Sequence, residues 1–162
     1  MNLDEVTAQL GVVTTIGRYV MAVDRGDVEA VCALFTTDGV LVPHGLPECH
    51  GAEAIAGFLE SSKASRSQRA GATTVRHHVT SVDVELALPG RARATSYFLA
   101  VSSTGLDHWG TYRDDLREVG PQWLFERRVV RLKGASPDGW IGSGTGPVRL
   151  DSEDGERGRA IL

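Results

Sequence analysis

The stretch TTVRHHVTSVDVELALPGRARATSYFLAVSS, residues 73–103, decides the fold of this chain. Its first part is long and rich in β-branched residues, and it stops at Pro89-Gly90, a turn signal. We therefore predict two antiparallel strands here, over 73–88 and 91–103. Beyond the turn marked by Gly105, the sequence predicts two further long strands, over 106–117 and 122–133.

The segment before these strands predicts helices. Apolar or small side chains recur at three- and four-residue steps between residues 3 and 24, which is typical of a buried helix face. Gly26 is placed to end this helix, and Asp27 to cap a short helix over 28–35. The apolar stripe comprises Leu3, Val6, Leu10, Val13, Gly17 and Val20. Between these helices and the long strands we expect a turn at 37–39, a strand at 40–42 stopped by Pro43, a helix at 51–62 and a polar loop at 63–71.

Helices followed by a meander of long strands predict an α+β fold with the helices on one side of the sheet. Such strands twist and curl, so we expect a concave face that encloses a small-molecule pocket. This single domain spans residues 1–135. Residues 136–162 are rich in Gly, Ser and acidic side chains, which is typical of a disordered tail. The apolar pair Trp140-Ile141 leaves a second interpretation open, a segment that folds back on the domain as a lid.

Composition narrows the class of protein. The 162 residues carry a net charge of −4, which argues against a nucleic acid partner. The N-terminus shows no signal-peptide pattern, and no apolar stretch approaches the ~20 residues needed to span a bilayer. Cys32 and Cys49 have no metal-type spacing and are too few for a disulfide framework. We therefore expect a cytoplasmic protein with no membrane or nucleic acid partner.

Asp24 is the strongest catalytic candidate. It stands where the stripe of the first helix requires an apolar side chain, and its charge opposes the helix dipole by roughly 0.3–1 kcal/mol. A residue that breaks two local rules at once indicates a functional site. The alternative is a carboxylate that bonds only within the turn leading to Asp27.

A histidine is the natural partner of such a carboxylate, and His77 and His78 are adjacent on the first long strand. Adjacent strand residues point to opposite faces, so only one of them lies on the concave side. The alternation does not decide between them, although a β-bulge would reconcile the conflicting signals. Apolar residues at 75 and 79 favour the odd-numbered side, and those at 82, 84 and 86 favour the even-numbered side.

Other polar residues complete the candidate site. His108 shares one side of its strand with Tyr112 and with Gly110, a glycine typical of a bend or a close ligand. Arg128 is the inward candidate among the arginines of the last strand. His44, Glu48 and His50 contain metal-binding side chains, but their loop fixes no common direction, so we predict no metal site.

The order of these segments resembles the SnoaL-like branch of the nuclear-transport-factor-2-like superfamily, over residues 3–133. The matching pieces are YVMAVDRGD, LFTTDGVLV, HGAEAIAGFL, RHHVTSVDVEL and GTYRDDLREVGPQWLFERRVVRL. The resemblance implies a cone, in which a curved antiparallel sheet wraps around the N-terminal helices as an α+β barrel with a deep, largely apolar pocket.

Within that branch the chain is similar to scytalone dehydratases, hexachlorocyclohexane dehydrochlorinases and polyketide cyclases. The resemblance implies that Asp24 and His77 are a catalytic pair and that no cofactor is needed. His77 keeps the family spacing to Thr80-Ser81 better than His78 does. Val23 replaces the tyrosine of scytalone dehydratases, which puts the same substrate in doubt. The expected substrate-binding residues are Tyr19, His78, His108, Tyr112 and Arg128.

The resemblance implies a cofactor-independent lyase, isomerase or cyclase, including epoxide-opening cyclisation, that acts on a small, largely apolar, natural-product-type substrate. It also implies a homo-oligomer, either a dimer or a trimer. Two alternatives belong to other classes. One is a non-catalytic small-molecule-binding cone, and the other is a structural protein like the β subunit of ring-hydroxylating dioxygenases.

Overall fold

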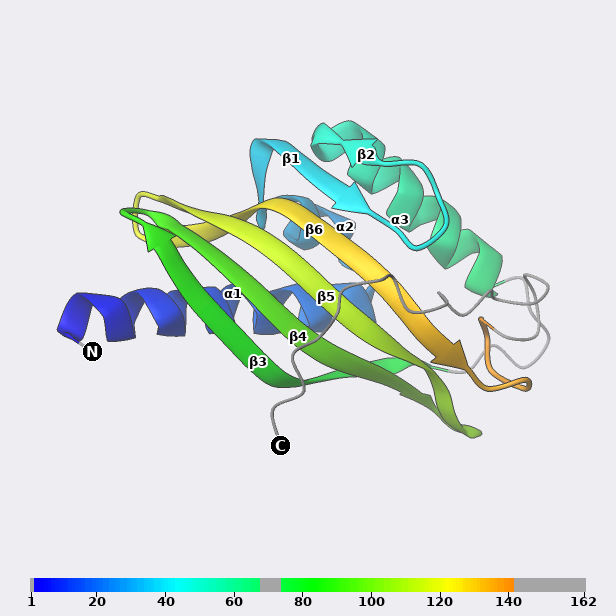
Figure 1. The fold of residues 1–162 in the computed structure, drawn as a ribbon. Helices are drawn as coiled ribbons and strands as arrows, with labels where there is room; N and C mark the ends of the chain where they lie inside the picture. Colours follow the sequence, from blue (N-terminus) through cyan, green and yellow to red (C-terminus); the bar gives the residue numbers. More distant parts are fainter. Residues whose placement is uncertain (1, 68–73, 142–162) are drawn as a thin grey trace.

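The computed structural model describes residues 2–67 and 74–141, and it has the predicted α+β architecture (Figure 1). The helices are α1 (Leu3–Arg25), α2 (Val28–Cys32) and α3 (Gly51–Ser67). The strands are β1 (Phe35–Val42), β2 (Cys49–His50), β3 (Arg76–Leu88), β4 (Arg91–Ser102), β5 (Gly105–Val119) and β6 (Gln122–Ala135).

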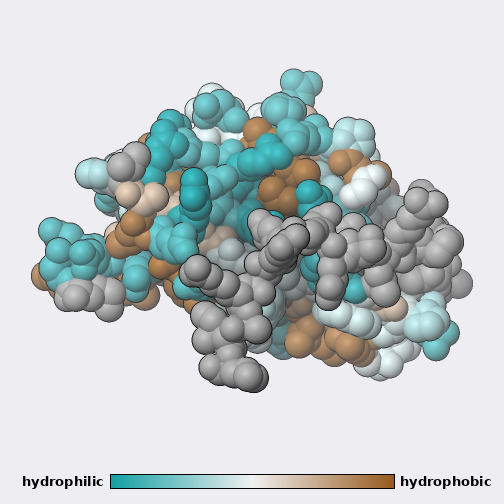
Figure 2. Space-filling view, viewed as in Figure 1, coloured by the Kyte–Doolittle hydropathy of each residue, from teal (hydrophilic) through white to brown (hydrophobic). Residues whose placement is uncertain are grey.

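The strands form one curved sheet in the order β2-β1-β6-β5-β4-β3. The long strands β3 to β6 form the predicted antiparallel meander, whereas β1 runs parallel to β6. The sheet is therefore mixed, and it is open, with β2 and β3 at its edges. Figure 1 shows α1 lying across one face of the sheet. The exterior seen in Figure 2 is mainly hydrophilic, with separate apolar patches.

The predicted buried stripe of α1 is wrong over most of its length, although its last member, Val20, is buried. Leu3 is 79% exposed and Leu10 64%, whereas the buried face is carried by Val12, Ile16 and Tyr19. The pattern misled because α1 has apolar residues on more than one side. By length and composition α1 would even suffice to cross a membrane, so the expectation that no stretch reaches this length is also wrong. A core helix meets the same criteria, which makes this weak evidence for a membrane span.

Several predicted boundaries shift. The short helix α2 ends at Cys32, and α3 extends to Ser67. Residues 37–39 form part of β1 and not a separate turn. Their turn-type residues are accommodated by an irregularity between Phe35 and Val40, where Gly39 packs against the Phe125 carbonyl of β6.

A β-bulge in β3 reconciles the two conflicting alternations. The register with β4 shifts between Thr80 and Asp83, and Ser81 within the bulge has a φ of 51°. A bulge inserts an extra residue and so changes which residues face inward. His77 before the bulge and Val84 after it are consequently both partly buried, whereas His78 and Asp83 are exposed.

Gly110 marks a close approach between strands. It lies at a register shift between β5 and β6, and a Cβ there would collide with the Arg131 carbonyl and lie 3.0 Å from the Phe98 ring. The neighbouring backbone, and not a ligand, therefore requires this glycine.

Gly110→Ala is expected to lower the free energy of unfolding by about 1–3 kcal/mol, the usual range for overpacking. Urea denaturation measures this change. Gly57→Ala is the matched control, because an added Cβ at Gly57 in α3 has no neighbour within 4 Å. That variant is expected to gain roughly 0.5–1 kcal/mol from the better helix former. Equal stabilities of the two variants would contradict the proposed clash.

Candidate active site

Asp24, in the last turn of α1, and His77, near the start of β3, form a direct pair. The Asp24 Oδ1 atom lies 2.7 Å from Nδ1 of His77, and Oδ2 accepts the backbone N–H of His77 at 3.0 Å. The two side chains are 8% and 13% exposed. One carboxylate thus holds both the ring and the backbone of His77. His78, by contrast, is exposed on the other side of β3 and does not join this cluster.

The charge of Asp24 fixes the orientation of the His77 ring. Burial raises the pKa of this carboxyl, but hydrogen bonds from the ring and backbone of His77 outweigh it and hold the pKa below its ordinary value. The ionised carboxylate can only accept hydrogen bonds, so Nδ1 of His77 carries the hydrogen. Nε2 is then the nitrogen that can take up a proton.

A second histidine lies beside the pair. His77 and His108 both pair with Ala100 of β4, from opposite sides, and their ring centroids are 5.6 Å apart. The small, fully buried side chain of Ala100 leaves space for this approach. His108 is buried, and its Nδ1 lies 2.7 Å from Oδ1 of Asp107.

Asp107 is a site residue that the sequence did not reveal. In a regular strand, Asp107 and His108 would point to opposite faces. The register with β4 shifts here, since Ala100 pairs with His108 and Val101 with Leu106, which leaves Asp107 unpaired in a bulge. The bulge brings the Asp107 carboxylate to the ring of its neighbour. The adjacency of an Asp and a His was the only available signal.

Residues 136–141, here called the C-terminal strap, fold back onto the start of β5. The backbone N–H of Trp140 donates to Oδ2 of Asp107 at 2.6 Å, and that of Ser136 donates to the Asp107 carbonyl at 2.7 Å. The Trp140 ring centroid lies 6.3 Å from that of His108. The sequence left two interpretations of Trp140-Ile141, a disordered tail and a segment that folds back on the domain. These two residues fold back. The remainder of the predicted tail, 142–162, lies outside the described residues.

Three of the expected substrate-binding residues cluster deeper, around Arg128. This side chain is fully buried, and its Nε and Nη2 atoms donate to the two Asp114 oxygens at 2.8 and 2.7 Å. The guanidinium lies 4.1 Å from the ring centroid of Tyr19 and 4.3 Å from that of Tyr112. Burial raises the pKa of both tyrosines, so their hydroxyls stay protonated. Phe98, stacked on Tyr112, separates this cluster from the histidines.

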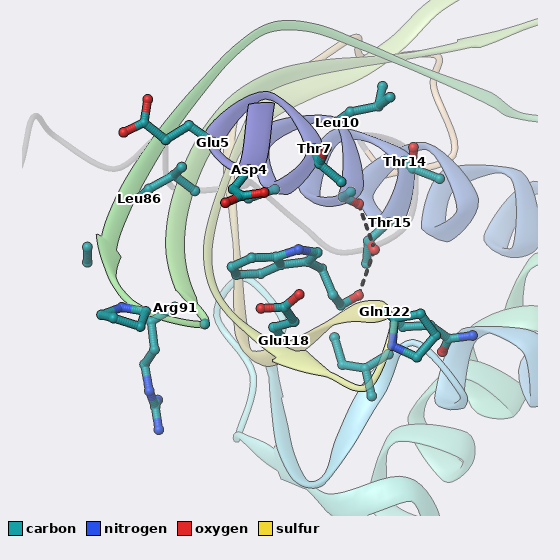
Figure 3. Close-up of a pocket in the computed structure, with 18 of the residues that line it drawn as sticks. Asp4, Glu5, Thr7, Leu10, Thr14, Thr15, Leu86, Arg91, Glu118 and Gln122 are labelled. Carbon is teal, nitrogen blue, oxygen red and sulfur yellow. Dashed lines mark hydrogen bonds between the residues drawn. The ribbon is translucent and has the colours of Figure 1, made fainter. Parts of the chain in front are cut away.

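A hollow of about 870 Å³ lies at the opposite end of the sheet from Asp24, between α1 and the turns that end β3 and β5 (Figure 3). Its walls include Asp4, Arg18 and Glu118 but neither Asp24 nor a histidine. This hollow is therefore not the pocket expected beside Asp24, which stays a prediction.

The residues His44, Glu48 and His50 form no metal cluster, and no group of three or more candidate ligands is found in residues 2–67 and 74–141. Glu48 instead accepts from Arg127 at 2.6 Å and lies 3.2 Å from Nε2 of His50.

Comparisons with known proteins agree with this fold. The sequence matches the family model of the SnoaL-like domain over residues 4–129. No curated protein matches the sequence significantly. Among solved structures, LinA is similar at a TM-score of 0.72 and 14% identity, over 83% of this chain and 92% of LinA.

Two further solved structures are similar. A candidate scytalone dehydratase from Novosphingobium aromaticivorans has a TM-score of 0.68 and 20% identity, over 82% of this chain and 88% of that one. ActVI-ORFA from Streptomyces coelicolor has a TM-score of 0.65 and 22% identity, over 77% and 96%. At these identities the likeness establishes the fold alone. The family match spans α1 and most of the sheet, and so the chain belongs to the SnoaL-like family.

Proposed function

We propose that this protein is a cofactor-independent acid/base enzyme that uses Asp24 and His77 to dehydrate, isomerise or cyclise a small, largely apolar substrate. The observation that carries the proposal is the buried hydrogen bond of 2.7 Å between the Asp24 carboxylate and Nδ1 of His77. A carboxylate in this position orients the imidazole and stabilises the imidazolium that forms when Nε2 accepts a proton.

The chemistry follows from this proton transfer. Nε2 of His77 takes a proton from a carbon next to a carbonyl, and the electrons of that C–H bond form a double bond. A β-hydroxyl then leaves as water after it receives a proton, which completes a dehydration. If an internal nucleophile attacks instead, the same pair catalyses a cyclisation. The aromatic surroundings provided by Phe98 and Trp140 favour a substrate that is largely apolar.

Similar proteins support this class of reaction. The family match and the likeness to a candidate scytalone dehydratase and to ActVI-ORFA agree with small-molecule acid/base chemistry. These matches support the general family to which the proposal belongs.

A panel of cyclic β-hydroxy ketones and aromatic polyketide-type ketones, incubated with the protein in D₂O, tests the proposal. Proton NMR follows both C–H exchange and loss of water. We expect wild type and His78→Gln to act on at least one compound, and His77→Gln to be slower by about 10²–10⁴-fold, the usual contribution of general acid–base catalysis. Exchange that is unchanged in His77→Gln would overturn the assigned role. Binding without exchange or turnover would favour the non-catalytic cone.

A further inference from the structure

We propose that Asp107 and His108 form a second acid–base pair in the same site, and that the C-terminal strap completes this pair by docking on Asp107. The inference deepens the proposed function, because it supplies the second proton-transfer group that the Asp24–His77 pair alone leaves unassigned. Asp107 is the positioning residue, and His108 is the second proton-transfer group.

The geometry makes the two pairs equivalent. In each, a carboxylate lies 2.7 Å from Nδ1 of a buried or nearly buried histidine. Because an ionised carboxylate only accepts, both rings are held as the Nδ1–H tautomer when neutral, with Nε2 left to exchange protons. The ring centroids lie 5.6 Å apart across Ala100, edge to face, in one cross-strand row of the sheet.

Two cationic rings at this separation repel each other, so the site favours the state in which only one of the two histidines is protonated. We call this proton the shared proton, because either histidine can carry it. The pKa of His108 lies below its ordinary value. Burial is the largest cause and the charge of His77 also lowers this pKa, whereas the hydrogen bond to Asp107 raises it. From the elements around His108, the facing titratable groups are Asp107 on β5 and His77 on β3, with Asp24 behind His77. Phe98 of β4, Ala135 of β6 and Trp140 of the strap carry no titratable group.

One shared proton suits a reaction that removes a proton at one atom and supplies one at another. The neutral histidine accepts a proton from the substrate carbon while the protonated histidine gives its proton to the departing hydroxyl. The leaving group departs as water, and the single proton is left on the histidine that acted as the base. Proton exchange with solvent then returns it to the other histidine before the next turnover. No further reactant is required.

The C-terminal strap is part of the second pair because it binds the same carboxylate as His108. Oδ1 of Asp107 faces the His108 ring, and Oδ2 accepts the backbone N–H of Trp140 at 2.6 Å. The Asp107 pKa is raised by burial, but the bonds from His108 and from the Trp140 backbone outweigh this and hold the pKa low. Gly139 permits the close approach, because a Cβ there would lie 2.8 Å from the Asp107 carbonyl oxygen. Docking of the strap and the tautomer of His108 therefore depend on one side chain.

NMR of the full chain with ¹⁵N-labelled histidine tests this inference without any substrate. In wild type we expect both His77 and His108 to show the Nδ1–H tautomer at pH 8. Asp107→Asn should release His108 from this tautomer while His77 keeps it, and should increase the acrylamide quenching of Trp140 fluorescence. Asp138→Asn is the matched control, because Asp138 is an exposed carboxylate in the same strap. A His108 tautomer and Trp140 quenching that are unchanged in Asp107→Asn would overturn the positioning role.

The shared proton is tested in a second variant that leaves Asp107 intact. In His77→Gln the titration midpoint of His108 should move to higher pH, because the neighbouring charge is removed. A midpoint that does not move would show that the two histidines titrate independently and would overturn the shared-proton arrangement. Absence of turnover on every compound, together with intact coupling between the rings, would count against the proposed function but not against this arrangement.

Discussion

Arg128→Met is expected to lower the free energy of unfolding by about 3–5 kcal/mol, the scale found when one partner of a buried ion pair is removed. Arg128 and Asp114 are both fully buried and joined by two hydrogen bonds. Loss of the guanidinium leaves the Asp114 carboxylate without its counter-charge in an interior formed by aromatic rings. It also removes the cation that lies 4.2 Å from the ring centroid of Phe125. Urea denaturation measures the change.

An exposed ion pair on the same sheet provides the matched control. Arg93 on β4 lies 3.6 Å from Asp115 on β5, and the side chains are 73% and 52% exposed. Arg93→Met should therefore cost only about 0–1 kcal/mol, because water screens the interaction. A double variant, Arg128→Met with Asp114→Leu, should recover much of the lost stability, since no charge then remains buried.

The outcome separates two roles for Arg128. The sequence predicted a substrate-binding arginine, whereas the structure surrounds its side chain with Asp114 and aromatic rings. If Arg128→Met unfolds at nearly the wild-type urea concentration yet no longer turns over substrate, the binding role is the correct one. If the loss is in stability, the ion pair is part of the core.

The order of the helices and strands could be predicted from the sequence because strong local signals mark where these elements begin and end. Pro89-Gly90 and the β-branched run before it predicted the hairpin of β3 and β4. Gly26 and Asp27 predicted the end of α1 and the cap of α2, and the structure confirms both through the left-handed Gly26 and the Asp27 bond to the Ala30 N–H.

The parts that were missed depend on packing between elements. A helix with apolar residues on several sides does not reveal which side the sheet covers, so the stripe of α1 was assigned to the wrong face. Asp24 was nonetheless singled out, although its burial comes from the start of β3 and not from that stripe. The bulge at Asp107 gave no signal in the sequence, whereas the conflicting alternation in β3 had suggested the bulge at Ser81. In both cases the pairing partners show which residues face inward.

Asp24→Asn is expected to reduce turnover by about 10²–10⁴-fold, the contribution typical of a positioned acid/base group, with little loss of stability. Measurement needs a reactive compound from the ketone panel and a thermal melt of each variant. Asp27→Asn is the control, because Asp27 only caps α2 and asparagine is an equally good cap. That variant should keep full activity.

The reason for the loss lies in the hydrogen bonds of the Asp24 carboxylate. Oδ1 lies 2.7 Å from Nδ1 of the His77 ring and accepts the His77 backbone N–H at 3.3 Å, and Oδ2 accepts the same N–H at 3.0 Å. An amide has one accepting oxygen and one donating nitrogen, so it cannot keep all of these bonds at their wild-type lengths. If its oxygen faces the backbone, its N–H₂ group faces Nδ1 and forces the hydrogen onto Nε2, which removes the base. If its oxygen faces the ring, its N–H₂ group faces the backbone N–H of His77, and two donors then meet without an acceptor. Wild-type turnover in Asp24→Asn would therefore show that the pair does not carry the reaction.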